Sequence, residues 1–148
     1  MPDILHRIGI RNTSIEMVYQ ALTTHVGLSG WWTSDTLGEG GLLGQLIQFR
    51  FGDQGIVVKV IELAAPSMVI WEVIDGPSEW YGTKISFELY QSEDFIILLF
   101  KHMDWKEPVE FMHHCSTKWA IFLMSLKKLV ETGVGAPHPN DTKIDNWN

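Results

Sequence analysis

The middle of the chain is a series of short strand patterns separated by turn signals, and a single long helical pattern follows it. Apolar and polar residues alternate with a period near two in most of these segments, and the last segment is apolar on both faces, which is typical of a central strand. The GDQG, DGPS and QSED segments predict tight turns, so successive strands are expected to pair antiparallel. The predicted strands cover residues 46–51, 56–63, 68–74, 80–90 and 95–102.

The segment after Pro108 has the pattern of a long amphipathic helix. Its hydrophobic residues recur at steps of three and four, and Gly133 provides a C-cap. Residues 134–148 contain two prolines and no periodicity, which predicts a tail that lies across the domain or stays mobile. The apolar stripe of the helix consists of Met112, Cys115, Trp119, Phe122, Leu126 and Val130.

The N-terminal region adds one more strand and a helical segment. Residues 4–10 alternate in polarity, and the sequence then offers Asn12, Thr13 or Ser14 as the N-cap of a short helix that stops near Gly27. The glycine-rich residues 36–44 predict a loop. The fold class is therefore α+β, with a curved antiparallel sheet of about six strands, one or two short helices after the first strand, helices on one face of the sheet, and a cavity between the sheet and the long C-terminal helix.

Composition and charge restrict the class of protein. A chain of 148 residues with 45% hydrophobic and 20% charged side chains predicts one globular domain, residues 1–148. The N-terminus has no signal-peptide pattern, and no apolar run is long enough to span a bilayer, so a cytoplasmic location is expected. The formal net charge of −7 disfavours nucleic acid and anionic membranes as partners.

The cysteine and histidine pattern disfavours a metal site and nucleophilic catalysis. Cys115 is the single cysteine, so it cannot form an internal disulfide, and its helical context predicts a buried small side chain. His113 and His114 are about 100° apart on a helix and cannot face the same site. No His-Glu-x-x-His or Gly-x-Ser-x-Gly motif is present, so neither a metal nor a cofactor is expected.

His102 is the one candidate for acid–base catalysis, because it ends a predicted core strand close to the start of the long helix. The alternative is a structural histidine that ties the strand end to the turn at Asp104 and Trp105 through hydrogen bonds. Further polar side chains that are candidates for such chemistry are Glu72, Glu110, His113 and His114.

Two adjacent tryptophans follow the HVGLSG segment, which reads as a glycine-rich turn. Adjacent residues of an irregular segment point in different directions, so only one is expected to reach the interior, and Trp32 is the predicted one. Trp32 could line a ligand cavity or act as a packing residue, since buried tryptophans do both.

Three motifs together resemble the SRPBCC (START-like) superfamily, and more narrowly the branch related to the C-terminal domain of the activator of the heat-shock ATPase. They are GLSGWWTSD, FKHMDW and STKWAIFLMSLKKLVETGVGAP. The resemblance covers nearly the whole chain and implies a helix-grip fold, in which the sheet grips the C-terminal helix over an elongated apolar pocket. It implies no single activity, because the superfamily includes lipid carriers, hormone receptors, aromatases and cyclases, and co-chaperone domains.

The favoured function is non-catalytic binding of a small hydrophobic molecule, aromatic or polycyclic, in that cavity. Two alternatives are a co-chaperone-like protein-binding module and a cofactor-free enzyme of the aromatase or cyclase kind. A homodimer through a sheet edge or the tail is a further option. The predicted ligand-binding residues are Trp32, Phe49, Phe51, Trp71, Trp80, Phe87, Phe100, His102, Trp119, Phe122 and Leu123.

Overall fold

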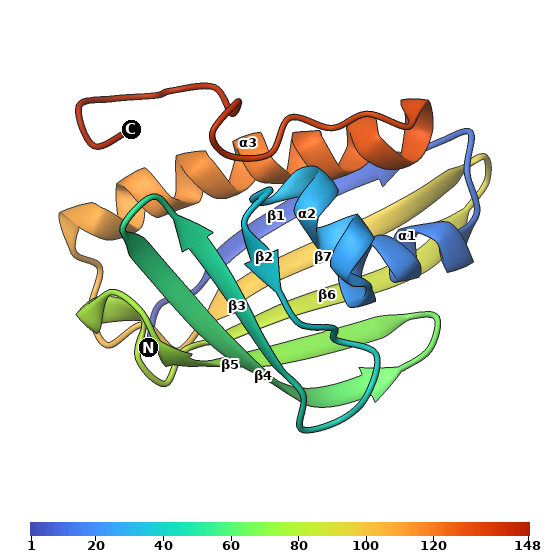
Figure 1. Ribbon diagram of the computed structural model, residues 1–148. Helices are drawn as coiled ribbons and strands as arrows, with labels where there is room; N and C mark the ends of the chain where they lie inside the picture. The colour runs from blue at the N-terminus through green and yellow to red at the C-terminus, as the bar shows by residue number, and fades with distance from the viewer.

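The computed structural model describes residues 1–148 and contains one antiparallel sheet and three α-helices (Figure 1). The strands are β1 (Ile4–Ile10), β2 (Thr36–Leu37), β3 (Leu46–Phe51), β4 (Gln54–Ala64), β5 (Met68–Asp75), β6 (Lys84–Ser92) and β7 (Phe95–Met103). The helices are α1 (Ile15–Thr23), α2 (His25–Trp31) and α3 (Glu110–Thr132), with a 3-10 turn η1 (Ser78–Trp80) between β5 and β6.

The sheet has the strand order β1-β7-β6-β5-β4-β3-β2, so β3 to β7 form a meander and β1 returns to pair with β7. Two register shifts between β4 and β5 interrupt the ladder, and such irregularities increase the local twist and bend of a strand. The sheet has seven strands instead of about six, because Thr36 and Leu37 pair with Phe49 and Gln48. A two-residue strand is too short to show a periodic pattern in the sequence.

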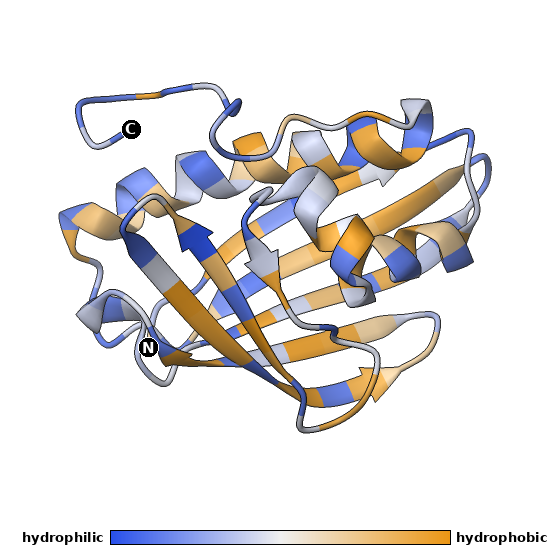
Figure 2. Cartoon of the chain, in the orientation of Figure 1, coloured by the Kyte–Doolittle hydropathy of each residue, from blue (hydrophilic) through white to orange (hydrophobic).

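The three helices lie on one face of the sheet, and α3 runs across it (Figure 1). Hydrophobic residues are concentrated in the strands, whereas they alternate with hydrophilic residues along α3 (Figure 2). Gly133 ends α3 in the left-handed conformation with φ 93°, as predicted for a C-cap. This arrangement confirms the predicted α+β class and the helix-grip fold.

The helical region after β1 is longer than predicted. Thr24 ends α1 and caps α2, because its hydroxyl accepts a hydrogen bond from the Gly27 backbone N–H at 3.0 Å. Gly27 therefore lies inside α2 and does not stop the helix. A Cβ atom at this position would lie 2.5 Å from Ala21 Cα, so the glycine allows α2 to pack closely against α1.

The prediction that only one of the two adjacent tryptophans reaches the interior is wrong. Trp31 is 0% exposed and Trp32 is 2% exposed, and their indole rings are nearly parallel with centroids 5.9 Å apart. Trp31 Nε1 donates a hydrogen bond to the Ala21 carbonyl at 2.8 Å. Both side chains are buried because α2 ends between the sheet and α3, which leaves no solvent-facing side at this end of the helix.

Residues 134–148 run back along α3 (Figure 1). The Ala136 backbone N–H donates to Ser125 Oγ at 2.8 Å, and the His138 backbone N–H donates to the Trp32 carbonyl at 2.8 Å. Asp141 in this tail is 4% exposed. The tail thus contacts both α3 and the end of α2, and it contributes to the site described next.

Candidate ligand-binding site

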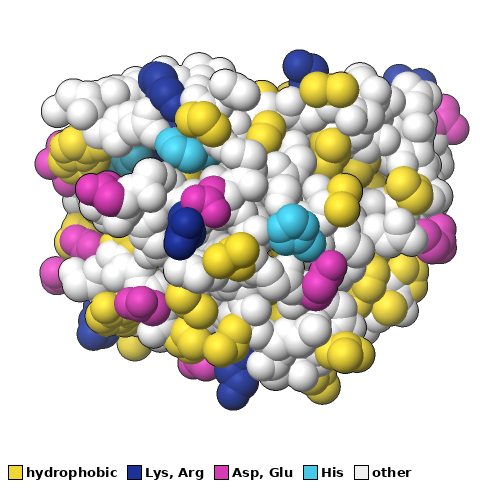
Figure 3. Space-filling view, viewed as in Figure 1, with side chains coloured by type: hydrophobic (Ala, Val, Ile, Leu, Met, Phe, Trp, Pro, Cys, Tyr) yellow, Lys and Arg dark blue, Asp and Glu magenta, His cyan; other side chains and the backbone are white.

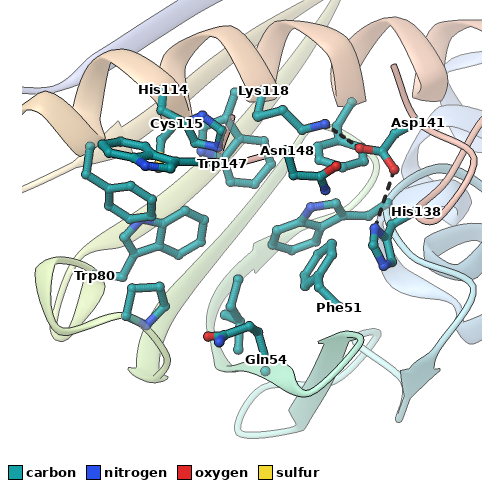
Figure 4. Close-up of a pocket in the computed structure, with 17 residues that line it drawn as sticks. Phe51, Gln54, Trp80, His114, Cys115, Lys118, His138, Asp141, Trp147 and Asn148 are labelled. Atoms are coloured by element: carbon teal, nitrogen blue, oxygen red, sulfur yellow. Dashed lines mark hydrogen bonds and ion pairs between the residues drawn. The ribbon is translucent and has the colours of Figure 1, made fainter. Parts of the chain in front are cut away.

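A cavity of about 420 Å³ lies between the β3–β4 hairpin, the N-terminal half of α3 and the C-terminal tail (Figure 4). Its volume falls in the range of cavities that hold small organic ligands. Of the 17 residues that line it, nine are hydrophobic, so the walls combine a large apolar surface with several polar groups.

Aromatic rings form most of the apolar wall. The Trp32 ring centroid lies 4.9 Å from that of Trp119 and 5.7 Å from that of Phe51. Trp80 and Trp119 are stacked with an interplanar angle of 16° and centroids 6.0 Å apart. These four residues and Phe122 are the members of the predicted set that line the cavity.

The other six predicted residues pack in the core and do not line the cavity. Two of these core residues pack against the cavity wall from inside. The ring centroid of Trp71 lies 6.1 Å from that of Trp32, and the ring centroid of Phe100 lies 4.5 Å from that of Trp119. The sequence pattern identifies which residues face inward but not how far along the sheet the cavity extends. The six residues are Phe49, Trp71, Phe87, Phe100, His102 and Leu123.

Several lining residues were not predicted, because the tail has no periodicity and these positions of α3 lie outside the predicted apolar stripe. Lys118 is three residues from Cys115, so it lies beside the apolar stripe, and that spacing could have identified it. Trp147 is a large aromatic side chain in an otherwise polar segment, which is also an available signal. The unpredicted lining residues include Phe111, His114, Lys118, His138, Asp141 and Trp147.

One end of the cavity is polar and is built around a buried carboxylate. Lys118 Nζ donates to Asp141 Oδ2 and, at 2.9 Å, to the Thr142 carbonyl. Lys143 Nζ donates to Asp141 Oδ1 at 3.0 Å, and His138 Nδ1 lies 3.4 Å from the same oxygen. Burial acts to raise the pKa of Asp141, but the hydrogen bonds from both lysines outweigh burial and hold the pKa below its usual value. Asp141 is therefore a carboxylate at neutral pH.

The end of the tail covers the opposite part of the cavity. His114 Nδ1 and Asp145 Oδ2 are 2.7 Å apart, and this hydrogen bond holds the pKa of the Asp145 carboxyl below its usual value. The centroid of the Trp147 ring lies 6.2 Å from that of Phe111 and 5.6 Å from that of His114. The Trp147 residue is half exposed. Trp147 therefore forms a partly open wall of aromatic character.

His102 is not an acid–base group of this cavity. Trp119 Nε1 donates to His102 Nδ1 at 3.1 Å, so His102 Nε2 carries the proton and donates to Thr83 Oγ1 at 2.8 Å. Thr83 in turn donates to the Trp80 carbonyl at 2.6 Å. Burial lowers the pKa of His102 to about 3, so the ring is neutral. The predicted alternative of a structural histidine describes it better, although its partners are Thr83 and Trp119 instead of the turn at Asp104.

Comparison with solved structures identifies the family. The chain is 46% identical to a protein described as the Aha1 dimer from Colwellia psychrerythraea, with a TM-score of 0.83 over 91% of this chain and 100% of that one. The chain belongs to the Aha1 family. No protein-family model and no curated protein matches it.

More distant structures share the fold of this Aha1-family chain. SSP2350 from Staphylococcus saprophyticus is 18% identical with a TM-score of 0.74, and the match covers 90% of this chain and 95% of that one. CalU16 from Micromonospora echinospora is 14% identical with a TM-score of 0.75, covering 97% of this chain and 74% of that one. At these identities the likeness shows the fold alone.

The remaining reactive groups of the Aha1-family chain give no nucleophile or metal site. Cys115 lines the cavity but is 4% exposed, and burial raises the pKa of its thiol to about 12, so the thiol stays protonated. No group of three or more His, Cys, Asp or Glu side chains is arranged to hold a metal ion. None of the helices has the length and apolar composition required to cross a membrane.

Proposed function

We propose that this chain binds a small planar aromatic molecule in the cavity between α3, the β3–β4 hairpin and the tail. The observation that carries the proposal is the wall of tryptophan and phenylalanine rings around about 420 Å³ of space. Stacking on such rings adds about 0.5–1.5 kcal/mol per aromatic pair to the burial of apolar area, which favours flat ligands over straight acyl chains.

Binding without catalysis agrees with the chemistry of three titratable groups, Asp141, Cys115 and His102. Asp141 is ionised and accepts hydrogen bonds from two lysines, so it has no proton to give and little basicity. The Cys115 thiol is protonated, and His102 lies outside the cavity. An aromatase or cyclase mechanism needs polar groups that can exchange protons with the ligand, and these side chains provide poor support for it.

The test is calorimetric titration with a flavonoid, a sterol, an aromatic polyketide and a fatty acid. Trp147→Ala is expected to weaken binding of the aromatic ligands by about 3- to 10-fold, because it removes one exposed aromatic wall. Tyr90→Ala is the matched control, since Tyr90 is also an exposed aromatic residue but does not line the cavity. Equal effects of the two substitutions, or binding of none of the four ligands, would contradict the proposal.

A second candidate function is self-association. The Colwellia relative is described as a dimer. In this chain, hydrophobic side chains gather on the lower part of the face that carries β2 and its connection to β3 (Figure 3). We propose that this surface binds a second copy of the chain, because an exposed cluster of this kind at a sheet edge is typical of an interface. The exposed residues are Leu37, Leu42, Leu43 and Leu46.

Sedimentation equilibrium tests this dimer. The double substitution Leu42→Glu and Leu43→Glu is expected to convert the dimer to a monomer, because it places four like charges against each other across a two-fold interface. Leu5→Glu is the control, since Leu5 is equally exposed on β1 at the opposite edge of the sheet. A wild-type monomer at high concentration would refute self-association and favour a different protein partner, as in the co-chaperone alternative.

A further inference from the structure

One buried donor among the lining residues has no hydrogen-bond partner, the indole Nε1 of Trp80. His138 Nδ1 has only its 3.4 Å contact with Asp141 Oδ1. Buried groups of this kind are rare and call for an explanation, because an unpaired buried donor costs about 1–3 kcal/mol. The Trp80 indole N–H acts to lower the pKa of the Cys115 thiol. A thiol is a weak acceptor, however, and no hydrogen bond of normal geometry forms between them.

Lys118 is a second source of donors. Its ammonium group has three N–H bonds, and two of them are used by Asp141 and the Thr142 carbonyl. Lys118 Nζ also lies 5.0 Å from the centroid of the Phe122 ring, which is part of the aromatic wall. The ammonium group is therefore located where the polar end of the cavity meets its aromatic surface (Figure 4).

The buried carboxylate at the same end is already occupied. Asp141 uses one oxygen for Lys118 and the other for Lys143. Both carboxylate oxygens of Asp141 are thus engaged by lysines. A ligand that brings an oxygen acceptor would therefore find a cationic donor in Lys118, whereas a ligand that brings only donors would find no free oxygen on Asp141.

We infer that the ligand is an aromatic compound with an acceptor oxygen, such as a ketone, phenolate or carboxylate, which binds the free N–H of Lys118. This inference rests on the proposed function and specifies its ligand class. A hydrocarbon of the same shape leaves the donors of the cavity unpaired, and sites built to hydrogen-bond a ligand reject analogues that lack the partner group.

The test compares 2-acetylnaphthalene with 2-isopropenylnaphthalene, which have nearly the same shape but differ in the carbonyl oxygen. Binding of both compounds to the intact chain is measured by competition with a fluorescent naphthalene ketone. We expect the ketone to bind at least 10-fold more tightly than the hydrocarbon. Lys118→Met is expected to reduce this preference to less than 3-fold, because Asp141 keeps its contact with Lys143.

Lys143→Met is the matched control, because Lys143 contacts the same carboxylate but does not line the cavity. It should retain the preference for the ketone. Equal binding of the two compounds to the wild type overturns the inference and leaves the proposed function intact, and this comparison needs no variant to fold. Retention of the preference in Lys118→Met also overturns it. Binding of neither compound overturns the proposed function as well.

Discussion

Replacing Trp32 by alanine is expected to lower the free energy of unfolding by about 3–5 kcal/mol. The Trp32 side chain is 2% exposed, and its ring lies within 6.5 Å of six other aromatic rings between centroids. Truncation removes this burial and leaves a large void between the sheet and α3, which the neighbouring rings can fill only in part. Urea denaturation followed by far-ultraviolet circular dichroism measures the change.

Trp147→Ala serves as the comparison, because Trp147 is half exposed and contacts only Phe111 and His114 among the aromatic rings. It should cost about 1 kcal/mol or less. If Trp32→Ala cost no more than Trp147→Ala, the packing role assigned to Trp32 would be wrong. Because Trp32 also supports the core, loss of ligand binding in Trp32→Ala would not by itself locate the ligand, and Trp147 is the better site for that purpose.

The second large effect is a loss of stability in mildly acidic solution that depends on His102. Burial lowers the pKa of His102 to about 3 in the folded chain, whereas the unfolded chain has the ordinary value near 6.5. Between these values the unfolded state binds a proton that the folded state does not, so the free energy of unfolding decreases as the pH falls. The expected decrease from pH 6.5 to pH 5 is about 2 kcal/mol.

The carboxyl groups with lowered pKa affect stability in a different window. The contributions of these groups to the free energy of unfolding are lost only below about pH 4, for Asp141, Glu131 and Asp145 alike. They therefore do not obscure the effect of His102 between pH 6.5 and pH 5. Urea denaturation of His102→Gln across this range should show a much smaller dependence on pH, whereas His113→Gln, at an exposed position, should behave as the wild type. An unchanged slope in His102→Gln would show that the neutral buried histidine is wrongly assigned.

The fold could be predicted from the sequence where its patterns are periodic. Most of the strands from Leu46 to His102 and the helix ending at Gly133 follow from alternation, turn residues and a C-cap. The strand predicted for residues 80–90 begins only at Lys84, because Trp80 lies in the 3-10 turn η1. The region around Gly27 could not be predicted correctly, because glycine disfavours a helix in isolation. In the fold, close contact between Gly27 and Ala21 overrides that local preference.

The site was predictable only in part, for a related reason. Helical periodicity identifies Trp119 and Phe122 as inward residues, and both line the cavity. Trp32 and Trp80 also line it, although neither lies in a periodic segment. The polar end is created by a tertiary contact between Lys118 on α3 and Asp141 on the tail, 23 residues further along the chain. No local pattern encodes such a pairing, and lysine and aspartate are each residue types that usually lie at the surface.

The most direct test of the ligand-binding proposal is a two-dimensional ¹H–¹⁵N NMR titration of the indole N–H signals with 2-acetylnaphthalene. The seven tryptophans provide probes inside and outside the cavity, and Trp→Phe variants assign them. We expect saturable shifts for the four tryptophans that line the cavity, Trp32, Trp80, Trp119 and Trp147, and no comparable shift for Trp31, which donates to the Ala21 carbonyl. If the four cavity signals stay unchanged, or if Trp31 moves as much as they do, the cavity is not the binding site.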